Sequence, residues 1–287
     1  MIYLLLSILA STLIFVIFNL IGKYKINTLQ AIVFNYFAAC ITGVLNTNTA
    51  LKPLELVNQQ WFFGAVFLGF LFIAIFNVMA LTAQRHGLSV ASVASKMSVV
   101  IPIVFGLYVY QENLGWQKGI GIFLALIAVY LTSIKARTGT IRLKNLWLPI
   151  VLFLGSGIID TTIKYLETRY IPNDGIPLFS ATIFFIAGCI GVTILTTKAL
   201  QKTLVFDLRS VFAGLLLGIV NYYSIFMLLK ALQFKNFESS TIFTINNVAI
   251  VMLSTLIGLA FFKEKLSIKN CSGIIIAVIS IVLITLS

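Results

Sequence analysis

Long apolar segments alternate with short polar loops along the whole chain. Each apolar segment approaches the roughly 20 residues with which a helix crosses a hydrocarbon core. Their predicted ranges are 2–21, 28–45, 61–82, 89–110, 117–134, 146–165, 177–197, 210–232, 239–262 and 268–286. Runs such as 4–6 and 274–276 are apolar on every side, unlike the alternating pattern of transmembrane strands. The pattern predicts an all-α integral membrane protein with ten transmembrane helices.

The second half of the chain repeats landmarks of the first half in the same order. The matching segments are Asn19 to Tyr24 with Asp160 to Tyr165, Gly69 and Gln84 with Gly218 and Gln233, and Glu112 to Gly121 with Glu264 to Gly273. Five spans is an odd number, so a second copy enters the bilayer from the opposite side. We therefore expect two five-helix repeats of inverted topology, residues 1–144 and 145–287. Such repeats build a substrate site at the membrane midplane and work by alternating access.

Composition narrows the function classes further. Hydrophobic residues make up 60% of the chain and charged residues 10%, with a mean hydropathy of +1.07, as in membrane proteins. The net charge of +12 comes from scattered Lys and Arg, which favours lipid headgroups over nucleic acid as the partner. A phosphate-binding Gly-rich loop is absent and His86 is the only histidine. The three cysteines, Cys40, Cys189 and Cys271, all fall within predicted spans, where packing explains them. The sequence predicts no enzyme, no cofactor and no metal site.

Lys96 is an ionisable residue inside the fourth apolar segment, and such residues are functional candidates. Ser89 and Ser92 precede it by seven and four residues and share its helix face. Pro102 should break the helix and leave the Ser98 carbonyl without its intrahelical donor. A cation, hydroxyls and an open carbonyl on one stretch are typical of a cavity wall, with Pro102 as a hinge. The alternative is that the long side chain of Lys96 extends to the membrane interface.

Polar residues in other spans extend this candidate substrate site. Asn246 is the repeat counterpart of Lys96, and Asn247 follows it; Ser240, Thr244, Asn247, Ser254 and Gly258 share one helix face. Asn19, Asn77 and Asn221 add amides to the first, third and eighth spans. We expect Lys96, Ser92, Asn19, Asn77, Asn221, Asn246 and Asn247 to bind substrate. Interhelical hydrogen bonding is the alternative for the Ser, Thr and Asn residues of the ninth span.

Asp160 is the one carboxylate expected at depth in the membrane, and it is a candidate for proton coupling because burial raises a carboxyl pKa. Its alternative role is an ion pair with Lys164, four residues later on the helix. Gly214 and Gly218 are expected to mediate close helix packing. Glu112 and Glu264, at span ends, are expected to make headgroup-level or helix-end contacts.

The chain resembles the drug/metabolite transporter superfamily, of the ten-helix EamA type. The likeness rests on the duplicated five-span unit, on the run from Gly87 to Ser92 and on Pro102. It also rests on the two tails, from Glu112 to Gly121 and from Glu264 to Gly273. The second half has no proline matching Pro102, so the two halves need not kink alike.

This resemblance implies a central cavity lined by spans one, three, four, six, eight and nine, where Lys96, Asp160 and Asn246 lie. It implies secondary transport of small organic metabolites, often export of amino acids or related compounds, in the cell (inner or plasma) membrane. An exchanger of phosphorylated sugars or nucleotide sugars and a non-transporting membrane subunit or sensor remain alternatives. A homodimer is one assembly that the sequence leaves open.

The positive-inside rule and the family resemblance place the two termini on opposite sides of the membrane. Lys and Arg are more numerous in the loops after odd-numbered spans, which by the positive-inside rule places both termini outside the cell. The family resemblance implies cytoplasmic termini. Charges near span ends act directly during insertion, so we expect external termini, and a C-terminal fluorescent or phosphatase reporter tests this.

Overall fold

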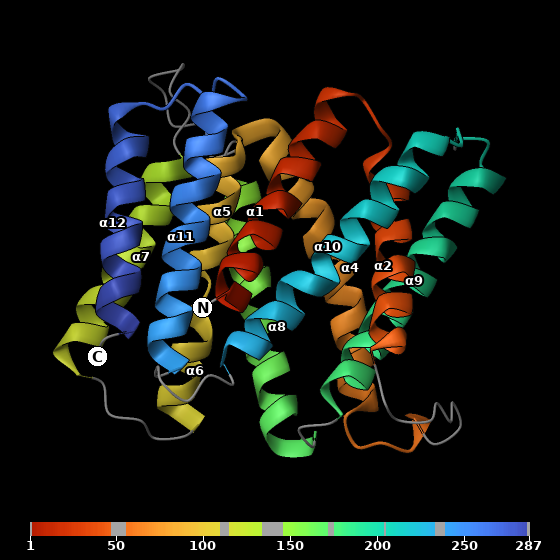
Figure 1. Ribbon diagram of the computed structural model, residues 1–287, viewed down its shortest axis with the longest axis horizontal. Helices are drawn as coiled ribbons and strands as arrows, with labels where there is room; N and C mark the ends of the chain where they lie inside the picture. Colours follow the sequence, from red (N-terminus) through yellow and green to blue (C-terminus); the bar gives the residue numbers. More distant parts are fainter. Residues whose placement is uncertain are drawn as a thin grey trace. The chain divides into compact units, whose positions relative to one another are not determined.

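The computed structural model describes residues 2–46, 56–109, 115–133, 146–171, 175–203, 205–232 and 239–285. The described part of the chain is helical and contains no strand. Its helices, drawn in Figure 1, are α1 (Ile2–Lys23), α2 (Thr28–Leu45), α4 (Phe62–His86), α5 (Leu88–Met97), α6 (Val100–Val109), α7 (Trp116–Ser133), α8 (Trp147–Tyr170), α9 (Ile176–Leu200), α10 (Leu208–Leu232), α11 (Ser239–Ala260) and α12 (Ile268–Thr285). These helices match the predicted apolar segments in order and closely in extent. One prediction needs refinement, because the fourth segment forms two helices, α5 and α6.

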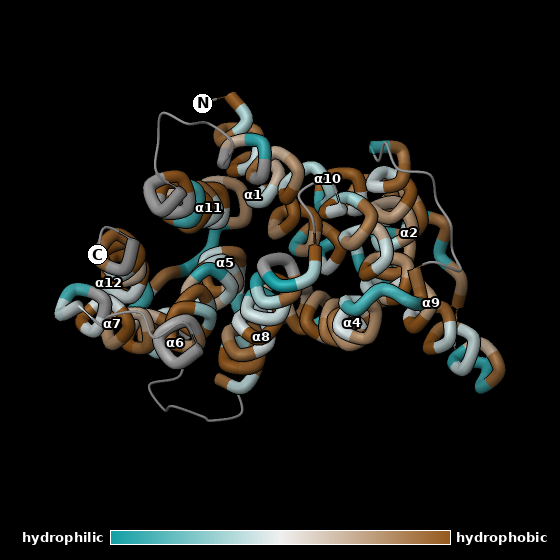
Figure 2. The backbone as a smooth tube through the Cα atoms, turned by 90° about the horizontal axis from the view of Figure 1, so that it is seen from below, coloured by the Kyte–Doolittle hydropathy of each residue, from teal (hydrophilic) through white to brown (hydrophobic). Residues whose placement is uncertain are grey.

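In the described part of the chain, seven stretches have the length and hydropathy of membrane-spanning helices, including the run Leu88–Phe105 that contains the break between α5 and α6. Shorter apolar helices cover Gly119–Thr132, Ile245–Ala260 and Ile268–Leu283. Hydrophobic colouring dominates the helices in Figure 2. Large apolar side chains such as Phe63 and Leu256 are exposed, which suits contact with lipid tails. The protein is therefore a multi-pass membrane protein.

Polar residues fix several helix starts. The Asn27 side chain accepts a hydrogen bond from the Gln30 backbone N–H at the start of α2. At the start of α12, the Ser267 hydroxyl accepts from the Asn270 N–H, while the Asn270 side chain accepts from the Ser267 N–H. Both arrangements satisfy backbone donors that a helix N-terminus leaves without partners. These caps explain why the helices begin where the polar residues interrupt the apolar pattern.

The chain divides into two compact units. Unit 1 comprises Met1–Leu20, Val78–Ile158 and Tyr223–Ser287, and unit 2 comprises Ile21–Asn77 and Ile159–Tyr222. Each unit takes segments from both halves of the sequence, so the units are a different division of the chain from the predicted repeats. The four divisions fall within α1 and α4 of the first half and within α8 and α10 of the second half. These are the first and third helices of each half.

The core of unit 1 joins residues of α5, α6, α7, α8, α11 and α12. Its buried members are Val93, Met97, Val100, Ala125, Ala128, Val129, Phe153, Val251, Ala277 and Ile281. Helices α7 and α12 pack extensively against each other. The Ser280 hydroxyl donates to the Gly121 carbonyl (2.7 Å), and the Asn270 side chain donates to the Thr132 carbonyl (2.9 Å). Later residues of α12 thus contact earlier residues of α7, so the two helices are antiparallel.

The core of unit 2 centres on Tyr36 of α2. Its ring packs near Phe76 and Phe184, and its hydroxyl donates to the Phe72 carbonyl at 2.7 Å. Burial of the Tyr36 hydroxyl is therefore compensated by a hydrogen bond.

Helices α2 and α9 of unit 2 pack extensively side by side (Figure 1). Gly191 of α9 lies against Val33, whereas Ala181 lies against Gly43, so this pair is also antiparallel. Helices α5 and α11 of unit 1 make a third antiparallel pair, described below. In the predicted repeat, α2 corresponds to α9, α7 to α12, and the segment of α5 and α6 to α11. Counterpart helices therefore pack on each other in opposite directions.

Candidate functional site

Helix α5 carries Ser92 and Lys96, and its start is held by a carboxylate from the second half of the chain. Glu264 accepts hydrogen bonds from the Leu88 N–H, from the Ser89 hydroxyl (2.8 Å) and, at 3.5 Å, from the Ser89 N–H. A carboxylate at a helix N-terminus satisfies orphan donors and complements the helix dipole. The expected helix-end contact of Glu264 is thus confirmed. Its predicted counterpart, Glu112, lies outside the described residues.

Two glycines make room for this carboxylate. A Cβ on Gly87 would lie 2.5 Å from a Glu264 carboxylate oxygen, and one on Gly258 would lie 2.6 Å from the other oxygen. Gly87 also has a φ of +100°, a region that side chains rarely adopt. The run from Gly87 to Ser89 and the tail at Glu264, which carried the family resemblance, therefore form one contact.

A second polar contact joins α5 to α11. The Ser92 and Ser254 hydroxyls lie 2.6 Å apart and both residues are fully buried. Ser92 also donates to the Ser89 carbonyl at 3.0 Å. Ser254 contacts Ser92, whereas Glu264, later in the chain, contacts the earlier Leu88. Helices α5 and α11 are therefore antiparallel. Ser92 therefore joins α5 to α11 in this structure.

Lys96 lies in the last turn of α5 and is half-buried. A cation at a helix C-terminus is favoured by the helix dipole, so Glu264 and Lys96 complement opposite ends of the same short helix. Lys96 is eight residues after the start and nine before the end of the apolar run Leu88–Phe105. It places an ammonium group within a spanning segment, as the candidate site requires.

The helix breaks directly after Lys96, at Ser98 and Val99. The Ile101 N–H donates to the Ser98 carbonyl (2.9 Å), and the Ile103 N–H donates to the Val99 carbonyl (3.3 Å). Pro102 has no N–H to donate to the Ser98 carbonyl, and Ile101 makes that bond instead. The break near Pro102 is confirmed, but the expectation of an open Ser98 carbonyl is wrong, because a tight turn gives that oxygen the Ile101 donor.

Asn246 of α11 is buried and belongs to a second polar cluster in unit 1. The Ser7 hydroxyl of α1 donates to the Ser224 carbonyl of α10 at 2.9 Å and lies 3.3 Å from the Asn246 side-chain oxygen. The single hydroxyl hydrogen of Ser7 cannot bond both oxygens well. With the oxygen and nitrogen of the Asn246 amide exchanged, Asn246 would donate to the Ser7 hydroxyl, and Ser7 would donate to Ser224 alone. Asn247 beside it is half-buried. The side chains of Ser240 and Thr244, predicted on the same face, lie outside the described residues.

Asn19 joins α1 to α4. Its amide donates to the Ala83 carbonyl (3.2 Å), and the Gln84 amide donates back to the Phe18 carbonyl (3.1 Å). Asn19 and Gln84 thus link α1 and α4 by reciprocal interhelical hydrogen bonds.

The remaining predicted site residues belong to unit 2. The Asn221 amide donates to the Asn35 side chain at 3.3 Å, linking α10 to α2, and both residues are buried. Asn77 donates to the Ile73 carbonyl of its own helix at 2.7 Å. Asp160 is exposed on α8, so the burial expected of this carboxylate is not found. The predicted residues therefore form separate local contacts: Ser92 and Asn246 join helices within unit 1, and Asn221 joins helices within unit 2.

Sequence analysis missed Ser7, Asn35 and Gln30, all buried polar residues in apolar helices. Each was detectable as a polar residue within a predicted span. Their roles depend on partners far along the chain, which a single sequence does not reveal. Like Ser92, Ser254 and Asn246, they are uncharged side chains that can form hydrogen bonds. No cluster of three metal-ligating side chains occurs among the described residues.

Replacing Glu264 with alanine should destabilise the protein by about 1–2 kcal/mol, the usual cost of losing a helix cap. Glu264→Gln should cost less, because it keeps an acceptor oxygen and loses the charge–dipole attraction of roughly 0.3–1 kcal/mol. Thermal unfolding in detergent measures both effects. Lys265→Ala, in the same loop at an exposed residue, is the control. Equal stability of wild type and Glu264→Ala would show that the carboxylate contact is not important for folding.

Comparison with known proteins supports the fold. No protein-family model matches the sequence. An uncharacterized protein of Haemophilus influenzae is 29% identical over 284 residues, which cover 96% of this chain and 94% of that protein. A protein of known crystal structure matches with a TM-score of 0.57 over 98% of each chain, at 14% identity. At that identity the likeness concerns the fold alone.

Proposed function

We propose that this protein is a secondary transporter of small organic solutes, an EamA-type member of the drug/metabolite transporter superfamily. Its ten apolar segments form an inverted 5+5 repeat in the cell membrane. The observation that carries the proposal is the antiparallel packing of α2 with α9, α5 with α11 and α7 with α12. Antiparallel counterparts are expected when the second repeat has the opposite topology. Inverted repeats are a recurrent architecture of secondary transporters.

Lys96 supplies the chemistry in this proposal. An ammonium group in an apolar span attracts an anionic group such as a substrate carboxylate. The buried hydroxyls of α5 and α11 and the buried amide of α11 add hydrogen-bond donors and acceptors. The break at Ser98 and Val99 supports a hinge there, because helix breaks at membrane depth often accompany transport sites. Asp160 is the proposed proton-coupling residue.

Transport by the purified protein in liposomes tests the proposal. We expect uptake or counterflow of a labelled amino acid, organic acid or amphipathic cation without ATP. Protein-free liposomes measure the leak. If every solute moves only at the leak rate while the protein remains folded, the non-transporting subunit or sensor becomes the better interpretation. If phosphorylated sugars alone exchange, the exchanger alternative holds.

The role of Asp160 is tested in the same liposomes. Asp160→Asn should make the flux insensitive to an imposed pH gradient, since the amide cannot exchange a proton. Wild-type pH dependence in this variant would make Asp160 structural.

A further inference from the structure

One end of unit 2 is built from the start of α2, the end of α9 and the start of α10. Because α2 and α9 are antiparallel, Lys25 before α2 lies at the same end as Lys202 after α9. Gln30 joins these segments: its side chain donates to the Val205 carbonyl (2.7 Å) and accepts from the Asp207 N–H (3.1 Å). We name this region the basic end; it comprises residues 23–30 and 198–209.

Lys25 and Lys202 hold an unfavourable backbone conformation. Their φ angles are +53° and +55°, in the left-handed region that favours glycine. Each follows a helix and is part of the same closing pattern, in which the Ile26 N–H bonds the Ile21 carbonyl and the Thr203 N–H bonds the Lys198 carbonyl. The described non-glycine residues with positive φ are Lys25, Lys202 and Lys263, all lysines. Glycine or asparagine would fit this backbone better than lysine.

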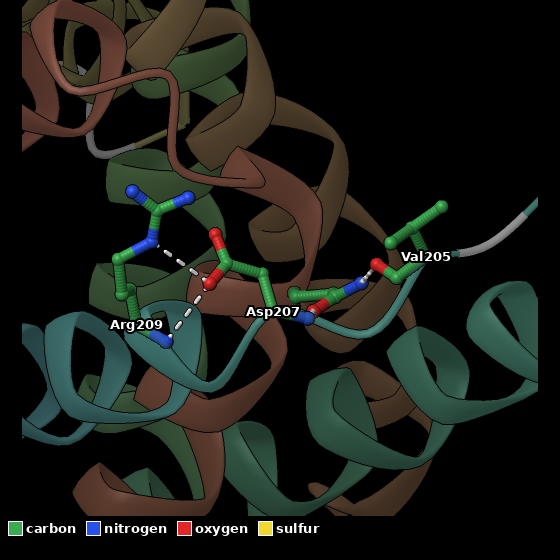
Figure 3. Close-up of polar contacts among 4 residues, drawn as sticks. Val205, Asp207 and Arg209 are labelled. Carbon is green, nitrogen blue, oxygen red and sulfur yellow. Dashed lines mark hydrogen bonds and ion pairs between the residues drawn. The ribbon is translucent and has the colours of Figure 1, made fainter.

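The basic end carries a net positive charge of its own. Residues 23–30 and 198–209 contain Lys23, Lys25, Lys198, Lys202 and Arg209, with Asp207 as the only acidic residue. Asp207 pairs with Arg209 at 3.0 Å (Figure 3), and the hydrogen bond from Arg209 lowers the pKa of the Asp207 carboxyl. The Asp207 carboxylate is thus engaged by its neighbour, which leaves an excess of lysine charge.

Exposed apolar side chains stand beside these lysines. Leu200 and Val205 are each 80% exposed, and Tyr24, Phe206 and Leu208 are also exposed. Lysines next to exposed aromatic and aliphatic residues at the ends of spanning helices are typical of the membrane interface, where acyl chains and phosphate groups meet.

We propose that the basic end of unit 2 binds the phosphate of an anionic phospholipid through Lys25 and Lys202. The lysine ammonium groups neutralise the phosphate, while Leu200, Val205 and Phe206 contact the acyl region. This attraction compensates for the left-handed backbone of the two lysines. Attraction between a lysine and its own helix dipole is also favourable, but it does not depend on the lipid.

The test compares thermal unfolding in neutral phosphatidylcholine nanodiscs with unfolding in nanodiscs that contain phosphatidylglycerol. We expect phosphatidylglycerol to raise the unfolding temperature of the wild type. Lys25→Gly/Lys202→Gly should unfold at a higher temperature than the wild type in the neutral nanodiscs, because the backbone strain is relieved. It should nevertheless lose most of the increase caused by phosphatidylglycerol.

Two matched variants separate this site from general charge effects. Lys25→Arg/Lys202→Arg keeps both charges and should retain the phosphatidylglycerol effect. Lys269→Gln, at an exposed residue of unit 1, removes a lysine elsewhere and should also retain it. An unchanged phosphatidylglycerol effect in the double glycine variant would overturn the proposal. So would an equal stabilisation of the wild type by millimolar glycerol phosphate, which would make the ligand a soluble phosphate.

Discussion

Replacing Lys96 with methionine should strongly weaken the binding of acidic or zwitterionic solutes while leaving the fold intact. Methionine preserves much of the side-chain length and apolar contact but removes the ammonium. A hydrogen bond to a charged group contributes about 1.5–3 kcal/mol, so affinity should fall roughly 10- to 100-fold. Equilibrium binding to the detergent-purified protein, using the solute identified by liposome transport, measures the loss directly.

Lys269→Met provides the control for this experiment. It makes the same change at an exposed residue near the start of α12 and should bind the solute with unchanged affinity. Unfolding temperatures of both variants show whether the fold is retained. Unaltered affinity in a folded Lys96→Met protein would reject the role of Lys96 and favour its alternative extension to the interface.

Replacing Gly218 with alanine should strongly destabilise unit 2. A Cβ on Gly218 would lie 2.3 Å from the Asn35 carbonyl oxygen of α2, and backbone cannot rotate away as a side chain can. Overpacking of this kind costs about 1–3 kcal/mol, and α10 must shift from α2 to relieve it. The shift should also strain the hydrogen bond from Asn221 to Asn35, one turn further along α10. A lower unfolding temperature measures the effect.

Gly119→Ala is the matched control for this substitution. Gly119 is in α7, and a Cβ there would meet nothing within 4 Å. Alanine is preferred over glycine in helices by about 1 kcal/mol, so this variant should be as stable as the wild type or slightly more stable. If Gly218→Ala behaves like Gly119→Ala, the close approach of α10 to α2 is not a feature of the folded protein.

The helices could be predicted from sequence because a spanning helix has a simple signature in length and hydropathy. The break in the fourth segment was signalled by Pro102, whose ring removes a backbone donor. The new partner of the Ser98 carbonyl was not predictable, because a carbonyl without its usual helical donor can accept from a neighbouring N–H in a tighter turn. Gly214 shows the successful case: its predicted close packing is confirmed by the Ala31 carbonyl, which would lie 2.5 Å from an added Cβ.

The polar residues were easier to find than to interpret. Asn19 and Asn246 were identified because amides are rare in apolar spans. Their hydrogen-bond partners depend on how the helices pack, which the sequence alone does not give. Ser7 bonds residues 217 and 239 positions away, and no local pattern indicates such a contact. Glu264 was better constrained, because a carboxylate at a span end commonly meets a helix terminus. The role of Lys96 as a substrate ligand stays a prediction.

The seam between α2 and α9 is self-complementary. Gly43 of α2 packs against Ala181 of α9, and Gly191 of α9 packs against Val33 of α2. Each helix therefore places a glycine where a side chain of the other helix packs. Interfaces between identical subunits related by a two-fold axis have this reciprocal form, in which the same patch is used twice. The contacts between α2 and α9 are therefore of the kind that two copies of one helix would make with each other across a two-fold axis.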